Sequence, residues 1–363
     1  MNRTNFIRNH LYSDAGVFIR ELLQRSAVND QGGATMDAFK ALFVDKIDKE
    51  AVISTRAIGL HDLPDGDLLI KVNYSSVNYK DALACKSDGN IVKSYPFIPG
   101  IDLAGTVVTS GTERFQAGDE VIVTGYGLGV SHYGGFSEYA CVPSEWALKL
   151  PNHLSQKEAM LVGTAGFTAA LSTLEIQENG VKPEDGPILV TGATGGVGSM
   201  AVSMLAKLGY EVVASTGKAD MTEELLRLGA ARVIARGELH SERTRALDKQ
   251  RWAGAIDCVG GATLASLLPA LQYGGVVAAS GLTGGIELDT SVFPFILRGV
   301  RLIGIDSVMI PMARRENVWQ RMADSFKPSL EESLYEEITL EQVKDYVPII
   351  LSGQSRGRVL VRL

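Results

Sequence analysis

The sequence has 363 residues, 45% hydrophobic and 21% charged, which indicates a globular protein too long for one ordinary core. The net charge of −7 argues against a general nucleic-acid surface. The three cysteines form no closely spaced pair, and no apolar run reaches the roughly 18 residues that span a bilayer, so we expect a reducing, cytoplasmic setting and no membrane partner.

The first 35 residues differ in composition and residue pattern from the rest. They carry scattered arginines and a polar, loop-like stretch at 29–33, and they lack the continuous apolar core of a secretion signal. A strand-like segment begins just after Met36, which resembles a natural start. We therefore expect residues 1–35 to be a peripheral extension, with one helix near residues 15–24.

Residues 36–155 are rich in short strand-like segments separated by Gly, Pro and Asp. This texture is typical of a compact, barrel-like β domain. The candidate strands are 39–44, 67–77, 101–110, 120–124 and 134–142. A helical stretch over 155–180 follows, with Ser155 as N-cap and Glu158 three residues later, interrupted at Gly163 and Gly166.

From residue 186 strands and helices alternate, which is typical of a doubly wound parallel sheet. The candidate strands are 188–191, 211–215, 232–235, 255–259, 275–280 and 300–305. Helices are expected over 200–208, from Thr222 to near Gly229, and over 312–326. The sequence thus predicts a second domain over 156–310 and a C-terminal segment, 311–363, that returns to the first domain through a strand near 358–361.

A glycine-rich turn lies between the first of these strands and its helix, in the stretch Thr191-Gly192-Ala193-Thr194-Gly195-Gly196-Val197-Gly198. Glycines let the backbone approach a pyrophosphate, and a helix N-terminus offers free N–H groups and a partial positive charge. The turn predicts dinucleotide binding. The glycine pattern of this turn also matches short-chain dehydrogenases. That family requires a tyrosine with a lysine four residues later, and no tyrosine of this sequence has one.

The end of the second strand indicates which dinucleotide binds. NAD-preferring folds usually carry an acidic residue there, whereas this chain has Ser215-Thr216-Gly217-Lys218. Lys218, and Arg236 after the third strand, can bind the additional phosphate of NADPH, although both can also be ordinary surface charges. NADPH is therefore the expected cofactor.

Several motifs resemble the medium-chain dehydrogenase/reductase superfamily, in its zinc-free quinone-oxidoreductase-like branch and its acrylyl-CoA reductase group (YhdH/AcuI type). The motifs are Ser75-Ser76-Val77-Asn78-Tyr79-Lys80-Asp81-Ala82-Leu83, Pro96–Gly105, Gly163–Ala169, Trp252–Asp257, Pro294–Arg298 and Gly304–Val308. The resemblance covers residues 36–363. It implies an α/β architecture with a GroES-like β-rich catalytic domain and a Rossmann doubly wound parallel sheet.

The resemblance also implies that no zinc is bound. In zinc-dependent relatives a Cys stands at about the place of Asn78, His-Glu at Ile101-Asp102, and another Cys near Thr164. None of these positions supplies a thiolate or an imidazole here, and the five histidines show no metal-like spacing. Without zinc, hydride addition to a carbon–carbon double bond next to a carbonyl is favoured over alcohol oxidation.

The resemblance places Asn78, Tyr79 and Asp81 in the catalytic cleft. Tyr79 resembles the tyrosine that contacts the nicotinamide side of the cofactor, and it could also donate a proton. Asn78 could orient substrate or water, and Asp81 could tune either residue or simply cap the following helix. The matching cofactor residues are Thr194, Gly195, Gly196, Val197, Thr216, Gly217, Lys218, Arg236, Ser280, Leu282 and Arg356, the last standing where relatives can have an amide.

The implied function is NADPH-dependent reduction of the double bond of acrylyl-CoA or a similar short 2-enoyl-CoA. An NADPH:quinone oxidoreductase and a non-catalytic NADPH-binding protein remain open as alternatives. Arginines that could bind CoA phosphates, or simply lie at solvated element ends, are Arg298, Arg301, Arg314 and Arg315. The family also implies a homodimer whose sheets join edge to edge.

Overall fold

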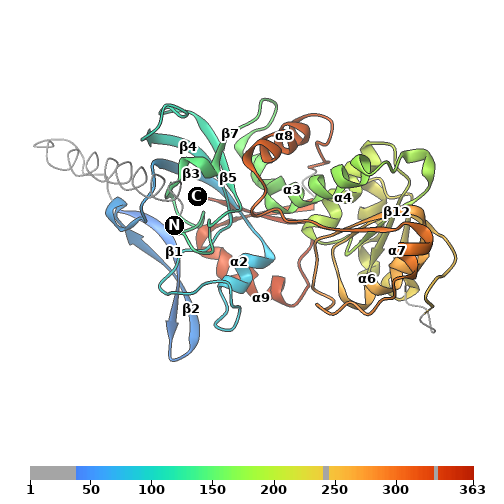
Figure 1. Cartoon of the computed structure of the whole chain (residues 1–363). Helices are drawn as coiled ribbons and strands as arrows, with labels where there is room; N and C mark the ends of the chain where they lie inside the picture. Colours follow the sequence, from blue (N-terminus) through green and yellow to red (C-terminus); the bar gives the residue numbers. More distant parts are fainter. Residues whose placement is uncertain (1–37, 240–244, 331–333) are drawn as a thin grey trace, which may run out of the picture. The chain divides into compact units, whose positions relative to one another are not determined.

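The computed structural model describes residues 38–239, 245–330 and 334–363, which form two compact units (Figure 1). The first unit ends at Thr164 and resumes at Tyr335, and the second runs from Ala165 to Leu334. The first division lies 9 residues beyond the boundary expected from the sequence at 155/156, and the second lies 24 residues beyond the one expected at 310/311. The helix predicted near residues 15–24 lies outside the described residues.

A seven-stranded sheet forms the frame of the first unit. Its order is β14-β15-β3-β4-β5-β7, and β6 also pairs with β3. The bounds are β3 Leu68–Val77, β4 Asp102–Ser110, β5 Glu120–Thr124, β6 Tyr139–Val142, β7 Ala147–Lys149, β14 Tyr335–Thr339 and β15 Arg358–Arg362. β15 pairs antiparallel with β3, with Val359 opposite Val77. The C-terminal strand, which the sequence analysis expected to return to the first domain, therefore pairs within the sheet of the first unit.

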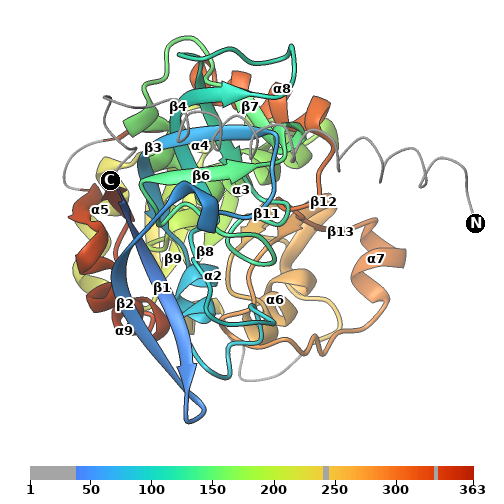
Figure 2. The ribbon, with the colours of Figure 1, turned by 90° about the vertical axis from the view of Figure 1, so that its left-hand side faces the viewer.

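A separate antiparallel hairpin precedes this sheet (Figure 2). It consists of β1 Phe39–Ile47 and β2 Glu50–Ile58, joined by Asp48 and Lys49 at φ 50° and 73°. The sequence predicted the first part of β1 but not β2. The strand expected over 134–142 is also shorter than predicted, since β6 begins only at Tyr139. Before it, the backbone at Gly134 packs closely on the Pro99 carbonyl oxygen, which would lie 2.4 Å from a Cβ at Gly134, and this packing takes the place of strand pairing.

Three helices accompany the first unit: α2 Tyr79–Ala84, α9 Val343–Leu351 and the first part of α3 Gln156–Glu178. The N-terminus of α3 is capped as predicted, since the Glu158 amide donates to Ser155 Oγ and the Ser155 amide donates to the Glu158 carboxylate. Gly163 breaks the helix at φ 51°, ψ −160°, as expected, whereas Gly166 does not. α3 is long and apolar enough to cross a membrane, but 89% of its apolar window is buried, which fits a core helix.

The second unit is built on a six-stranded parallel sheet in the order β10-β9-β8-β11-β12-β13. The bounds are β8 Ile188–Thr191, β9 Val212–Thr216, β10 Arg232–Ala235, β11 Trp252–Asp257, β12 Leu271–Ala279 and β13 Arg301–Gly304. β8 and β10 agree with the sequence prediction at both ends. β11 begins and ends earlier than expected, because buried Trp252 and Ala253 already belong to it.

Helices connect most of these strands, which gives the predicted doubly wound arrangement. They are α4 Gly196–Lys207, α5 Thr222–Arg227, α6 Gly261–Leu267 and α7 Phe293–Arg298, and α8 Met312–Ala323 follows the last strand of this sheet. Short 3-10 helices are η1 Leu60–Asp62, η2 Ser144–Trp146, η3 Pro183–Asp185, η4 Ala219–Met221, η5 Arg236–Leu239, η6 Leu268–Ala270 and η8 Leu340–Gln342. All of β8 is buried, as expected for a parallel strand covered on both faces.

Candidate functional site

The glycine turn joins β8 to the N-terminus of α4. Gly192 has φ 60°, and a Cβ at Gly198 would lie 2.3 Å from the Gly192 carbonyl oxygen, so both positions require glycine. Gly195 is the N-cap of α4 and supplies no capping side chain, and the first turn holds no acidic residue. The N–H groups in the first turn of this twelve-residue helix are thus left for an anion, which fits the pyrophosphate of a dinucleotide.

The predicted residues for the adenosine phosphate come together at the ends of β9 and β10. Thr216 Oγ1 accepts a hydrogen bond of 3.0 Å from the Lys218 amide and lies 3.3 Å from Thr194 Oγ1. A Cβ at Gly217 would lie 3.4 Å from a guanidinium nitrogen of Arg236. Neutral hydroxyls and the Arg236 guanidinium therefore lie at this strand end, and the cationic residue Lys218 follows it two positions later, which fits a phosphate-bearing ribose.

An orphaned hydroxyl supports this fit. Ser215 is 1% exposed, and its Oγ has no hydrogen-bond partner among the described residues. Buried hydroxyls are normally bonded, so an unpartnered one beside the glycine turn fits a group supplied by a ligand. On the other side of β8, Ser280 and Leu282 follow β12, and Leu282 is 57% exposed.

In the first unit, a polar network surrounds the buried carboxylate of Asp102. Its Oδ2 accepts hydrogen bonds of 2.8 Å from Ser76 Oγ, 2.8 Å from Asn78 Nδ2 and 2.9 Å from the Thr164 amide. Its Oδ1 accepts from the Thr164 hydroxyl. The break at Gly163 allows this approach, since a Cβ there would lie 2.7 Å from the Asp102 carboxylate.

Arg358 completes this network, and the sequence analysis did not identify it. Its guanidinium is 4% exposed and donates to Asn78 Oδ1 at 3.2 Å, to Ser76 Oγ at 2.8 Å and to the Leu161 carbonyl at 2.9 Å. It also lies 4.0 Å from the Asp102 carboxylate. Burial lowers the pKa of Arg358, partly offset by the nearby carboxylates. Only the pairing of β15 with β3 brings it here.

The three predicted catalytic residues lie at the start of α2. Asp81 is 1% exposed and accepts hydrogen bonds from the backbone amides of Asn78, Gly100 and Ile101. Burial, and then the charge of Asp102, raise the pKa of Asp81 to about 7. Asp81 thus caps α2 and fastens the 100–101 segment to it, while Tyr79, at 41% exposure, is open to solvent.

The network does not fit a zinc ion. Asn78, Asp102 and Thr164 come together, at the positions that carry zinc ligands in zinc-dependent relatives, but they present an amide, a carboxylate and a hydroxyl. The carboxylate is already bonded to its neighbours, and the Arg358 cation stands beside it. No group of three or more metal-binding side chains occurs within residues 38–239, 245–330 and 334–363.

The four arginines considered for CoA phosphates all bond to protein oxygens. Arg298 donates to backbone carbonyls including that of Pro269, and Arg301 to that of Asn179. Arg314 forms ion pairs with Glu175 and Glu178. Arg315 is fully buried against the carbonyls of Ser307 and Val308, so it does not lie at a solvated end. Arg356, in contrast to Arg358, is exposed in the first unit.

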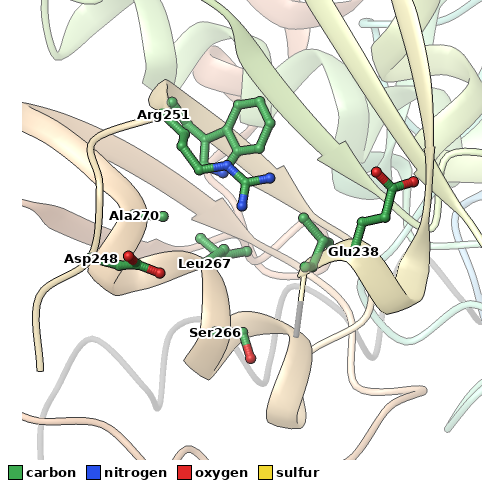
Figure 3. A pocket seen from close by; sticks show the side chains of 8 residues that line it. Glu238, Asp248, Arg251, Ser266, Leu267 and Ala270 are labelled. Carbon is green, nitrogen blue, oxygen red and sulfur yellow. The ribbon is translucent and has the colours of Figure 1, made fainter. Parts of the chain in front are cut away.

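A small cavity of about 210 Å³ lies at the amino ends of strands of the parallel sheet (Figure 3). Its lining includes Trp252, the first residue of β11, and Ala270, which directly precedes β12. Ligands of open parallel sheets bind at the carboxyl ends of the strands. This cavity is at the amino ends, and we do not assign it to the cofactor.

Two family models match the chain. The alcohol dehydrogenase GroES-like domain matches residues 64–152, and the zinc-binding dehydrogenase domain matches residues 196–326. The Bacillus subtilis protein named "Putative quinone oxidoreductase YhfP" is 54% identical over 90% of this chain and 99% of its own length. Its crystal structure with NAD bound superposes with a TM-score of 0.88.

Two further relatives match over nearly their whole length. Acrylyl-CoA reductase AcuI of Ruegeria pomeroyi is 46% identical over 89% of this chain and 98% of its own. The yhdH oxidoreductase of Salmonella enterica, crystallised in complex with NADP, is 46% identical, covers 89% of this chain and 99% of its own, and has a TM-score of 0.86. The similarity thus extends through both units.

Proposed function

The chain belongs to the medium-chain dehydrogenase/reductase superfamily, and we propose that it catalyses the NADPH-dependent reduction of the double bond of acrylyl-CoA or a similar short 2-enoyl-CoA. The observation that carries the proposal is the Asp102 network, which has hydrogen-bonded protein groups and a guanidinium where a zinc-dependent relative binds its metal. Hydride addition to an activated alkene needs no Lewis acid of that kind. The relative named as an acrylyl-CoA reductase supports this substrate class.

The second unit would bind the cofactor. Thr194, Gly195, Gly196 and Val197 form the turn and first helical residues that receive the pyrophosphate. Ser215, Thr216, Gly217, Lys218 and Arg236 receive the phosphate-bearing adenosine, and Ser280 and Leu282 lie at the strand end on the other side of β8. Bound NADPH supplies a hydride to the β-carbon of the substrate, and a proton is added at the α-carbon.

The first unit positions the reacting groups. Both N–H groups of the Asn78 side chain are used, one toward Asp102 and one toward the Ser76 carbonyl, and its oxygen accepts from Arg358. Asn78 is therefore held in one orientation, and Asp81 fixes the turn that follows it. We assign both residues a positioning role. Tyr79, exposed beside them, contacts the cofactor, and solvent can supply the proton. Arg356 is a further proposed cofactor contact.

The reaction can be tested with NADPH deuterated at the transferable hydrogen and acrylyl-CoA as substrate. We expect one deuterium at the β-carbon of the propionyl-CoA product and none at the α-carbon, because the α-hydrogen comes from solvent. Absence of NADPH oxidation with every short 2-enoyl-CoA offered would reject the proposal and leave the non-catalytic NADPH-binding alternative.

A second candidate is an NADPH:quinone oxidoreductase. The observation that favours it is that YhfP, a relative named as a putative quinone oxidoreductase, is more similar to this chain in sequence than the acrylyl-CoA reductase of Ruegeria pomeroyi is. A quinone accepts a hydride without metal assistance as well. Comparison of the catalytic efficiencies for an enoyl-CoA and a quinone separates the two candidates. A cytoplasmic location accords with both, since all three cysteines are free thiols.

We also propose that the chain forms a homodimer. β13 is an edge strand of the parallel sheet, and the neighbouring α7 exposes Ile296 and Leu297 by 69% and 54%. An exposed apolar helix face beside an unpaired strand edge is a site for association. Sedimentation should give the mass of two chains, and Ile296→Glu should give one. A monomeric wild-type protein would contradict the dimer without affecting the proposed reaction.

A further inference from the structure

Three turns meet at the carboxyl ends of β8, β11 and β12, which are neighbours in the parallel sheet. A Cβ at Gly281 would lie 2.0 Å from the Cys258 carbonyl, and one at Gly260 would lie 2.6 Å from the Gly281 carbonyl oxygen. A Cβ at Gly192 would contact the side chains of Val259 and Cys258 at 3.2 and 3.4 Å. The turns after β11 and β12 therefore pack backbone against backbone, and the side chains of Cys258 and Val259 pack on Gly192 of the third turn.

One residue is bonded to all three. Asp257 is 0% exposed, and its Oδ1 accepts a hydrogen bond of 2.6 Å from the hydroxyl of Thr191, the last residue of β8. Its Oδ2 accepts from the Gly260 amide at 2.8 Å, and its backbone carbonyl accepts from the Ser280 amide at 2.9 Å. Thr191 Oγ1 in turn accepts from the Cys258 amide at 3.0 Å.

The strand order indicates which half of the cofactor this junction serves. The groups suited to the adenosine phosphate follow β9 and β10, on one side of β8. The pyrophosphate site is the α4 N-terminus directly after β8. The remainder of an extended dinucleotide must then continue to the other side, over β11 and β12.

We propose that Asp257 is a positioning residue for the nicotinamide half of the cofactor, a role that rests on the proposed use of NADPH. Its carboxylate fastens the turn after β11 to Thr191, at the start of the glycine turn, and its backbone carbonyl holds the turn after β12. Together these bonds fix the surface against which the ring is placed. Its carboxylate accepts hydrogen bonds from the Thr191 hydroxyl and the Gly260 amide. Burial raises the pKa of Asp257, and these donors partly offset that effect.

The test compares two ligands by isothermal titration calorimetry: NADPH, and 2′,5′-ADP, which carries only the phosphorylated adenosine half. For Asp257→Asn we expect NADPH affinity to fall about 10-fold and 2′,5′-ADP affinity to change less than about 2-fold, since one hydrogen bond to a charged group is lost on the nicotinamide side alone. Thr191→Val, which keeps the shape of the side chain, should act in the same direction. The double variant should be less than additive, because both changes break one bonded pair.

Thr173→Val is the matched control. It removes an equally buried hydroxyl that bonds within α3, to the Ala169 carbonyl, and it should leave both affinities unchanged. Equal losses for the two ligands, or no loss for NADPH in either Asp257→Asn or Thr191→Val, would overturn the positioning role. If Asp257→Asn does not fold, Thr191→Val decides. Failure of the wild-type protein to bind NADPH would instead reject the proposed function.

Discussion

The guanidinium of Arg358 donates a hydrogen bond of 3.2 Å to the side-chain oxygen of Asn78, which stands 280 positions earlier in the chain. β15 carries the arginine, and its antiparallel pairing with β3 brings it to the residue that precedes α2. The last strand of the chain therefore supplies a side chain that holds Asn78, the N-cap residue of α2. Two predictions concern this network.

The first is that Arg358→Met reduces both stability and turnover. It leaves the buried Asp102 carboxylate without its cation, so we expect the free energy of unfolding to fall by ~3 kcal/mol in urea titrations. We also expect a loss in kcat, because Asn78 is released. Arg362→Met is the control in the same strand: its side chain is 63% exposed and pairs with Glu337, so the loss should stay below about 1 kcal/mol. Equal effects of the two substitutions would contradict a special role for Arg358.

The second concerns pH. Burial, and then Asp102, raise the pKa of Asp81 to about 7, so the folded protein holds this proton more tightly than the unfolded chain. The resulting stability is full below about pH 4 and is lost as the pH rises to about 7. Relative to Asp81→Asn, the free energy of unfolding of the wild type should fall by up to ~4 kcal/mol over that interval. Parallel pH profiles of stability would show that Asp81 does not titrate there.

The parallel sheet was largely predictable from the sequence. Apolar runs such as 188–191 are buried on both faces, and Gly192 and Gly209 mark the ends of elements by adopting positive φ. The hairpin strand β2 was not predictable, because its residues are mostly half-buried or exposed and show no clean alternation. Arg358 was missed for a different reason: an arginine in a terminal strand looks like a surface charge until tertiary pairing buries it.

The third prediction concerns cofactor choice. Lys218→Ala and Arg236→Ala should each weaken NADPH binding about 10-fold or more, because a charged contact to the ribose phosphate is removed. NADH, which lacks that phosphate, should bind the variants about as it binds the wild type. Lys182→Ala, in the loop before β8, serves as the control. The measurement is calorimetry with both cofactors. A similar loss of affinity for NADH would show that the lysine and the arginine do not bind the ribose phosphate.

The fourth separates two roles of Tyr79. If its ring contacts the cofactor while solvent supplies the proton, Tyr79→Phe should keep kcat within about 3-fold, a small effect compared with loss of a general acid. Tyr79→Ala should weaken NADPH binding several-fold, since the ring is lost. Stopped-flow measurement of hydride transfer, together with cofactor titration, tests both points. A loss of 100-fold or more in Tyr79→Phe would instead identify the hydroxyl as the proton donor.

We propose that the chain reduces an alkene conjugated to a thioester. The most direct measurement is kcat/KM of the wild-type protein for acrylyl-CoA, beside crotonyl-CoA and a simple quinone, by NADPH oxidation under one set of conditions. We predict the highest value for acrylyl-CoA, with crotonyl-CoA lower and the quinone lower by at least about 10-fold, a difference of ~1.4 kcal/mol in transition-state stabilisation. A higher value for the quinone than for either enoyl-CoA would contradict the claim.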